Sequence, residues 1–143
     1  MKKYLSKNVN QTLVLSLRLA KLLKGGDVVL FKGGLGSGKT TFVKGIARYF
    51  GIRSLIQSPT FVIYKPYTIS KHRSKCKAEY LYHIDTYRLN NKKGAESLGL
   101  FDILTNKNNI VLIENPKYFF TNVSNKKYVT IKNINSTTRL FQF

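Results

Sequence analysis

The feature that most constrains this chain is the stretch GGLGSGKT at residues 33–40, which directly follows an apolar run. It fits the phosphate-binding pattern G-x-x-x-x-G-K-[ST] at every fixed position. The run at residues 27–31 predicts a buried strand, and apolar residues recur at helical spacing over residues 42–50, with Gly51 as the expected C-terminal cap. A strand, a glycine-rich loop and a helix in this order predict a P-loop nucleotide-binding domain of the α/β class.

Each part of the loop has an expected chemical role. Glycines allow positive φ, so consecutive N–H groups can surround the β-phosphate at the N-terminus of the next helix. Lys39 is expected to reach the β- and γ-phosphates, Thr40 to ligate Mg²⁺ and Thr41 to donate toward the α-phosphate. The residues predicted to bind the nucleotide are Gly33, Gly36, Ser37, Gly38, Lys39, Thr40 and Thr41.

Two of the six acidic residues follow apolar runs that read as buried strands. Asp85 ends the segment Tyr80–Asp85 and Glu114 ends Asn109–Glu114, so both acids are expected at the sheet edge where the phosphates bind. Carboxylates there are expected metal partners, although each could instead end its strand on the surface beside Arg88 or Lys117. His83 shares a strand face with Asp85 and is expected to be structural rather than catalytic.

The remaining pattern predicts one domain over residues 1–143, with a mostly parallel sheet flanked by helices and with C-terminal β-strands. A first helix is expected over residues 13–23, capped by Asn10 or Thr12 and ended by Gly25-Gly26. Further strands are expected at residues 60–64, 128–134 and 139–143.

The net charge of +19 is open to two interpretations. Clustered Lys and Arg are the electrostatic footprint of a nucleic-acid partner, and the densest run lies at residues 71–77. However, Lys supplies most of the charge, and the chain is rich in other residues with AT-rich codons. A solvated basic surface and an RNA-facing patch therefore stay equally open.

Two further expectations come from sequence features that are absent. The basic N-terminus is followed by an apolar stretch that Ser16, Arg18 and Lys21 interrupt, so no signal peptide and no membrane segment is expected and a cytoplasmic location is favoured. The guanine-reading pattern Asn-Lys-x-Asp is missing, since residues 106–109 read NKNN. ATP is therefore expected rather than GTP.

The ordered motifs together resemble the TsaE (YjeE) family of ATPases, which assist formation of threonylcarbamoyladenosine in bacterial tRNA. The resemblance covers roughly residues 12–116. It rests on the helix before the loop and on GGLGSGKTT at 33–41, SPTF at 58–61, HIDTYRL at 83–89, LGL at 98–100 and IENP at 113–116.

This resemblance implies a small α/β ATPase that uses ATP and Mg²⁺ and acts with TsaD and TsaB, which transfer the threonylcarbamoyl group to the adenosine beside the anticodon. It implies that Thr40 and Glu114 lie at the metal site and that Asp85 is needed for activity. Ser58 and Thr60 match a turn that either senses the nucleotide or is a plain proline turn. Contact with tRNA would be indirect or through the basic surface.

The chain departs from the family pattern at two places. Asn115 stands where the family usually has Trp, which removes a large aromatic contact surface and puts any docking or gating role of that residue in doubt. The basic stretch at residues 70–77 is longer than usual and reads as a tolerated insertion or as an added RNA contact.

The expected reaction is in-line attack of water on the γ-phosphate, with Lys39 and Mg²⁺ neutralising charge and Asp85 orienting the water or the metal shell. No arginine finger is evident, so turnover is expected to be slow without partners. The alternatives are a nucleotide-gated assembly subunit with incidental hydrolysis and a small-molecule kinase, which would be expected to have a longer chain with an arginine-rich lid. A basic RNA-binding domain would explain the charge but not the P-loop.

Overall fold

The computed structural model describes residues 1–70 and 76–143, and its strands form one mixed sheet. The strands are β1 (Lys3–Ser6), β2 (Val28–Lys32), β3 (Tyr64–Thr68), β4 (Tyr80–Asp85), β5 (Asn109–Glu114), β6 (Lys126–Asn133) and β7 (Arg139–Gln142). Within the described residues their order across the sheet is β1-β7-β6-β2-β5-β4-β3. The pairings among β4, β5, β2 and β6 are parallel, whereas β1–β7, β6–β7 and β3–β4 are antiparallel.

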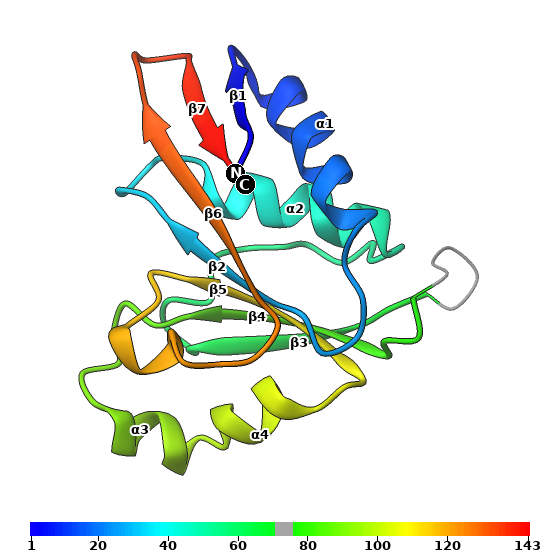
Figure 1. The fold of residues 1–143 in the computed structure, drawn as a ribbon, viewed down its shortest axis with the longest axis vertical. Coiled ribbons are helices and arrows are strands. Elements are labelled where there is room, and N and C mark those ends of the chain that lie inside the picture. The colour runs from blue at the N-terminus through cyan, green and yellow to red at the C-terminus, as the bar shows by residue number, and fades with distance from the viewer. Residues whose placement is uncertain (71–75) are drawn as a thin grey trace.

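Helices cover both faces of the sheet (Figure 1). They are α1 (Val9–Ala20), α2 (Lys39–Tyr49), α3 (Lys92–Ser97), α4 (Leu100–Thr105) and the single 3₁₀ turn η1 (Tyr118–Phe120). Helices α1 and α2 pack on one face and α3 and α4 on the other. Strand β2 shows why both faces need cover: Val29 and Phe31 belong to the core under α1 and α2, while Val28 and Leu30 belong to the core under α3 and α4. The predicted α/β class with flanking helices and C-terminal strands is confirmed.

Helix α1 differs from its predicted bounds. It begins at Val9 rather than residue 13, because the side chain of Asn8 accepts the N–H of Gln11 at 2.9 Å and so caps the helix. The predicted caps Asn10 and Thr12 therefore lie inside the helix, which ends at Ala20.

The strand predicted over residues 60–64 is also wrong. The backbone N–H groups of Val62 and Ile63 both donate to the carbonyl of Pro59, which makes a turn, and β3 begins only at Tyr64. Strands β4 and β5 have their predicted bounds, while β6 and β7 differ from theirs by one or two residues. The sequence interpretation did not include β1, α3, α4 or η1.

Helices α1 and α2 approach closely at a glycine. A Cβ atom added at Gly45 would lie 1.7 Å from the Ser16 hydroxyl oxygen and 2.9 Å from its Cβ. A side chain at this position would overlap with that of Ser16, so glycine allows α1 and α2 to approach closely here. Across residues 1–70 and 76–143, no helix has both the length and the apolar character needed to cross a membrane.

Candidate functional site

The P-loop joins the C-terminal end of β2 to the first turn of α2. Gly38, the residue before the helix, has a φ of 100°, a conformation that side chains with a Cβ rarely adopt. Lys39 is buried, and its Nζ donates to the carbonyl oxygens of Gly33 at 2.9 Å and Gly34 at 3.0 Å. The loop thus curves around the ammonium group, whose charge lies within the turn. The hydroxyl of Ser37 is buried and has no hydrogen-bond partner among the described residues.

Two different elements bring side chains to one oxygen atom of Glu114. The hydroxyl of Thr40, on α2, donates to Oε1 of Glu114, at the end of β5, over 2.9 Å. Nε2 of His83, on β4, lies 2.8 Å from the same oxygen. A hydrogen bond there requires the proton on Nε2, since a carboxylate only accepts. The predicted metal-site pair Thr40 and Glu114 is therefore in direct contact, and the structural role expected for His83 is to hold Glu114.

Asp85 is held by four donors and is nearly inaccessible to solvent. Its Oδ2 accepts from Thr60 at 2.6 Å and from Ser58 at 3.1 Å. Its Oδ1 accepts from the Tyr87 backbone and from the amide of Asn115, each at 2.9 Å. Burial raises the pKa of this carboxyl, but the hydrogen bonds together lower it below its ordinary value. Asp85 is therefore ionised at neutral pH.

Asp85 and Glu114 are register partners in the parallel pair β4–β5. Both acids lie at the carboxyl ends of their strands, beside the P-loop, as the sequence pattern predicted. A cleft of about 590 Å³ opens here. Its lining comprises the loop from Leu35 to Thr41, with Ser58, Thr60, Asp85, Tyr87, Glu114 and Asn115.

A second hollow of about 390 Å³ lies against the other side of the loop and shares Gly36, Gly38 and Thr41 with the first. Its remaining walls come from the start of α1 and from residues 136–139, which include Arg139. No sequence motif marks these residues, either at the start of α1 or in the segment after residue 116.

Three further sequence predictions concern Asn115, the turn with Ser58 and Thr60, and the basic stretch at residues 70–77. Asn115 stands where the family usually has Trp, and this difference predicted the loss of a contact surface. In the fold, its side-chain amide instead donates a hydrogen bond to Asp85. Ser58 and Thr60 form a turn that contacts Asp85 directly. The basic stretch at residues 70–77 lies largely outside the described residues, since 71–75 are not among them.

The comparison with protein families decides the assignment. The family model described as "Threonylcarbamoyl adenosine biosynthesis protein TsaE" matches residues 6–141. The chain belongs to the TsaE family. The family resemblance drawn from the sequence motifs is thereby confirmed, and the family description links the chain to the biosynthesis of threonylcarbamoyladenosine in tRNA.

Curated relatives carry the name "tRNA threonylcarbamoyladenosine biosynthesis protein TsaE". The Streptomyces coelicolor protein is 45% identical over 75 residues, which are 52% of this chain and 47% of that protein. The Bacillus subtilis protein is 39% identical over 98 residues, covering 68% and 56%, and the Aquifex aeolicus protein 35% over 101 residues, covering 69% and 71%. The matched part of the chain thus spans about half the length of the first two of these relatives.

The fold likeness extends further than these sequence matches. The crystal structure of YdiB from Bacillus subtilis superposes with a TM-score of 0.74 at 27% sequence identity. The match covers 98% of this chain and 82% of the YdiB chain. The mixed sheet and both helical layers are therefore shared with a solved structure.

Proposed function

We propose that this chain is a Mg²⁺-dependent ATPase that acts with TsaD and TsaB in forming threonylcarbamoyladenosine beside the tRNA anticodon. The observation that carries the proposal is the contact between Thr40 and Glu114 in a cleft walled by the P-loop. A P-loop hydroxyl and a strand-end carboxylate within hydrogen-bond distance are a fitting donor pair for Mg²⁺, which prefers oxygen ligands. The family assignment supplies the biological context.

Hard-cation chemistry fits the residues of this cleft. Among residues 1–70 and 76–143, no group of three or more His, Cys, Asp and Glu could hold a metal by itself. Mg²⁺ is usually held by one or two protein groups together with substrate phosphates and water, so the pair Thr40 and Glu114 is sufficient. Bound there, Mg²⁺ would neutralise negative charge on the β- and γ-phosphates.

The chain's own residues account for the other requirements of phosphate transfer to water. The backbone N–H groups of the loop and of the first turn of α2 bind phosphate oxygens. Lys39 exchanges its two carbonyl partners for the β- and γ-phosphates, so its charge is already near where it is used. Asp85 is ionised and held by four donors, and it would orient the attacking water once Ser58 and Thr60 release its Oδ2. The second hollow, next to Thr41, accommodates the nucleoside.

One observation favours a second candidate, a nucleotide-gated assembly subunit with incidental hydrolysis. The hydroxyls of Ser58 and Thr60 engage Oδ2 of Asp85, so this oxygen reaches water only after the turn moves away. A turn that exchanges partners when nucleotide binds would report the nucleotide to a docked protein, whether or not hydrolysis follows.

The deciding experiment measures ATP hydrolysis by the purified protein with Mg²⁺, alone and with its own TsaB, TsaD and tRNA. Stimulation by the partners that disappears in Lys39→Ala supports the ATPase. Asp85→Ala is assayed in parallel, and unchanged steady-state hydrolysis in that variant would remove Asp85 from the mechanism.

Nucleotide binding is measured separately with a fluorescent ATP analogue. Binding without hydrolysis under every condition would replace the ATPase by the gated subunit. Failure of the wild-type protein to bind ATP at all would exclude both candidates.

A further inference from the structure

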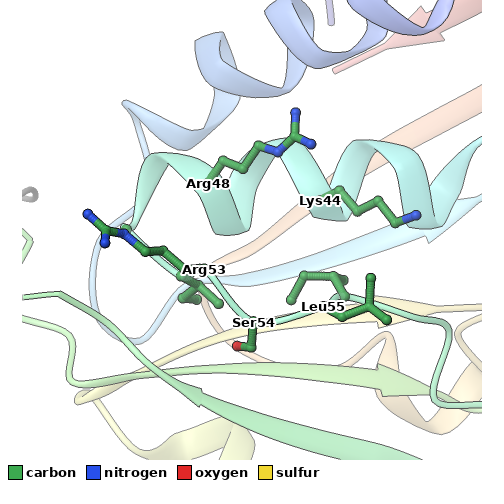
Figure 2. A pocket seen from close by; sticks show the side chains of 8 residues that line it. Lys44, Arg48, Arg53, Ser54 and Leu55 are labelled. Atoms are coloured by element: carbon green, nitrogen blue, oxygen red, sulfur yellow. The ribbon is translucent and has the colours of Figure 1, made fainter.

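A groove outside the candidate site lies between α2 and the segment that follows it. Its volume is about 580 Å³, and none of its lining residues belongs to the P-loop cleft. Figure 2 shows Lys44 and Arg48 extending from α2, and Arg53, Ser54 and Leu55 extending from the segment that runs beside the helix. Two elements of the fold therefore contribute cations to one concave surface.

These cations have no partners in the part of the chain that the structure describes. No ion pair, hydrogen bond or ring contact involves the charged ends of Lys44, Arg48 or Arg53. None of the six acidic residues of the chain lines the groove. Arg48 and Arg53 are exposed, so their guanidinium groups are open to an external anion.

The arrangement of the three charges indicates an extended anion. In Figure 2 their ends point in different directions rather than converging on one point, with the end of Arg48 turned to the side of α2 away from Arg53. Lys44 and Arg48 are four residues apart, which is a rise of about 6 Å along α2. A single phosphate ion could contact only one of them well, whereas a chain of phosphates can contact all three. Guanidinium groups also match phosphate oxygens with two parallel hydrogen bonds.

The lining favours an RNA backbone over an acidic protein surface. Of its apolar side chains only Leu55 is exposed, while Ile52 and Ile56 are buried, and this is little apolar area for the core of a protein interface. No aromatic residue lines the groove, so bases would not stack there and recognition would be through phosphates. The net charge of +19 adds long-range attraction for a polyanion.

We propose that this groove binds the phosphate backbone of RNA. The identification of this RNA as tRNA rests on the proposed function. The binding of RNA phosphates by the groove does not depend on it. The groove also borders the candidate site along the chain, because Leu55 is followed three residues later by Ser58, which contacts Asp85.

The test measures binding of a fluorescently labelled tRNA transcript by anisotropy at several salt concentrations between about 50 and 300 mM. The test variant is Arg48→Gln with Arg53→Gln. Its matched control is Lys93→Gln with Lys132→Gln, which removes two exposed positive charges far from the groove residues in sequence. The groove variant is expected to bind about tenfold more weakly, with a salt dependence reduced by about one to two released counterions. The control is expected to change affinity less than about threefold.

Equal weakening in both double variants would assign the effect to overall charge and overturn the proposal. So would unchanged affinity in the groove variant, or wild-type protein that does not bind the transcript. A fluorescent poly-glutamate peptide is titrated alongside, and a larger loss of peptide binding than of RNA binding would assign the groove to an acidic protein instead.

ATP hydrolysis of the same proteins separates this proposal from the previous one. Arg48 and Arg53 do not line the P-loop cleft, so both double variants are expected to hydrolyse ATP at the wild-type basal rate. Absence of hydrolysis in every protein would contradict the ATPase proposal and leave the RNA measurement valid.

Discussion

Thr60 donates a hydrogen bond to Oδ2 of Asp85 over 2.6 Å, although 25 positions separate the two residues in the sequence. Ser58 donates to the same oxygen, so one short turn holds one carboxylate oxygen with two hydroxyls. The other oxygen is held by Asn115 and by the Tyr87 backbone. Asp85 thereby connects the turn, β4 and the end of β5, which makes it both a candidate reactive group and a structural tie.

The ionised state of Asp85 is expected to stabilise the fold in a pH-dependent way. Burial raises its pKa, but its hydrogen bonds outweigh burial and leave the folded-state pKa below the ordinary 3.8. A lowered folded-state pKa gives stability that is complete above the unfolded value and is lost as the pH falls through the folded value. The free energy of unfolding of the wild type and of Asp85→Asn, from urea titrations, should therefore differ most at neutral pH and converge below about pH 4. A difference that stays constant down to about pH 2.5 would contradict this assignment.

Asn115 is expected to tolerate Gly better than Ala. Its φ of 54° lies in the left-handed region, which costs a residue with a Cβ about 1–2 kcal/mol and Asn less. Asn115→Gly should lose mainly the hydrogen bond to Asp85, about 1 kcal/mol, while Asn115→Ala should lose the bond and add the strain. Urea unfolding of both variants checks the order. Equal stability of the Gly and Ala variants would mean that the backbone conformation carries no strain.

His83 is expected to act as a positioning residue for Glu114 in Mg²⁺-dependent hydrolysis. His83→Ala should raise the Mg²⁺ concentration for half-maximal rate by about tenfold, because partners of a metal-binding carboxylate commonly contribute 10–100-fold to metal affinity. His83→Gln, which can still donate a hydrogen bond, should restore part of the loss. Nucleotide binding in EDTA serves as the control and should stay unchanged. An unaltered Mg²⁺ dependence in both variants would show that Glu114 is positioned without His83.

Two glycines inside helices provide a matched pair for stability. Gly45→Ala should destabilise the protein by about 1–3 kcal/mol, because the added methyl group would overlap with Ser16 of α1. Gly94→Ala adds the same group to α3, where its nearest neighbour lies 3.5 Å away, and alanine favours the helix by up to about 1 kcal/mol. Midpoints of urea unfolding should therefore move in opposite directions. An unchanged or raised midpoint for Gly45→Ala would refute the close packing of α1 on α2.

The parts of the fold that the sequence predicted are those in which local pattern and tertiary structure agree. Strands β4 and β5 alternate little in polarity because helices cover both faces, and each apolar run ends in an acid. The P-loop is predictable because phosphate binding constrains successive residues. In contrast, β1 and α3 are four and six residues long, too short for a periodic pattern to stand out. The strand expected at residues 60–64 failed because its β-favouring residues form a turn on Pro59.

The candidate site likewise has a part that the sequence predicted and a part that it did not. Thr40, Asp85 and Glu114 could be chosen from their positions at the ends of elements, and they line one cleft. The contacts of Asn115, Ser58 and Thr60 with Asp85 depend on how distant loops meet, which no local pattern records. Comparison of Asn115 with the Trp that is usual in the family predicts only the loss of an aromatic contact surface. In the fold, the smaller amide side chain makes a hydrogen bond to Asp85.

The adjacent placement of Asp85 and Glu114 across β4 and β5 has a consequence for the order in which ligands arrive. The pair forms a local negative spot inside a molecule whose net charge is +19. Within a Debye length of about 10 Å of this basic surface, a free divalent cation meets repulsion, whereas a nucleotide that already carries its cation is an anion and meets attraction. We therefore expect metal and nucleotide to enter together, and the two carboxylates to select the cation only at the last step.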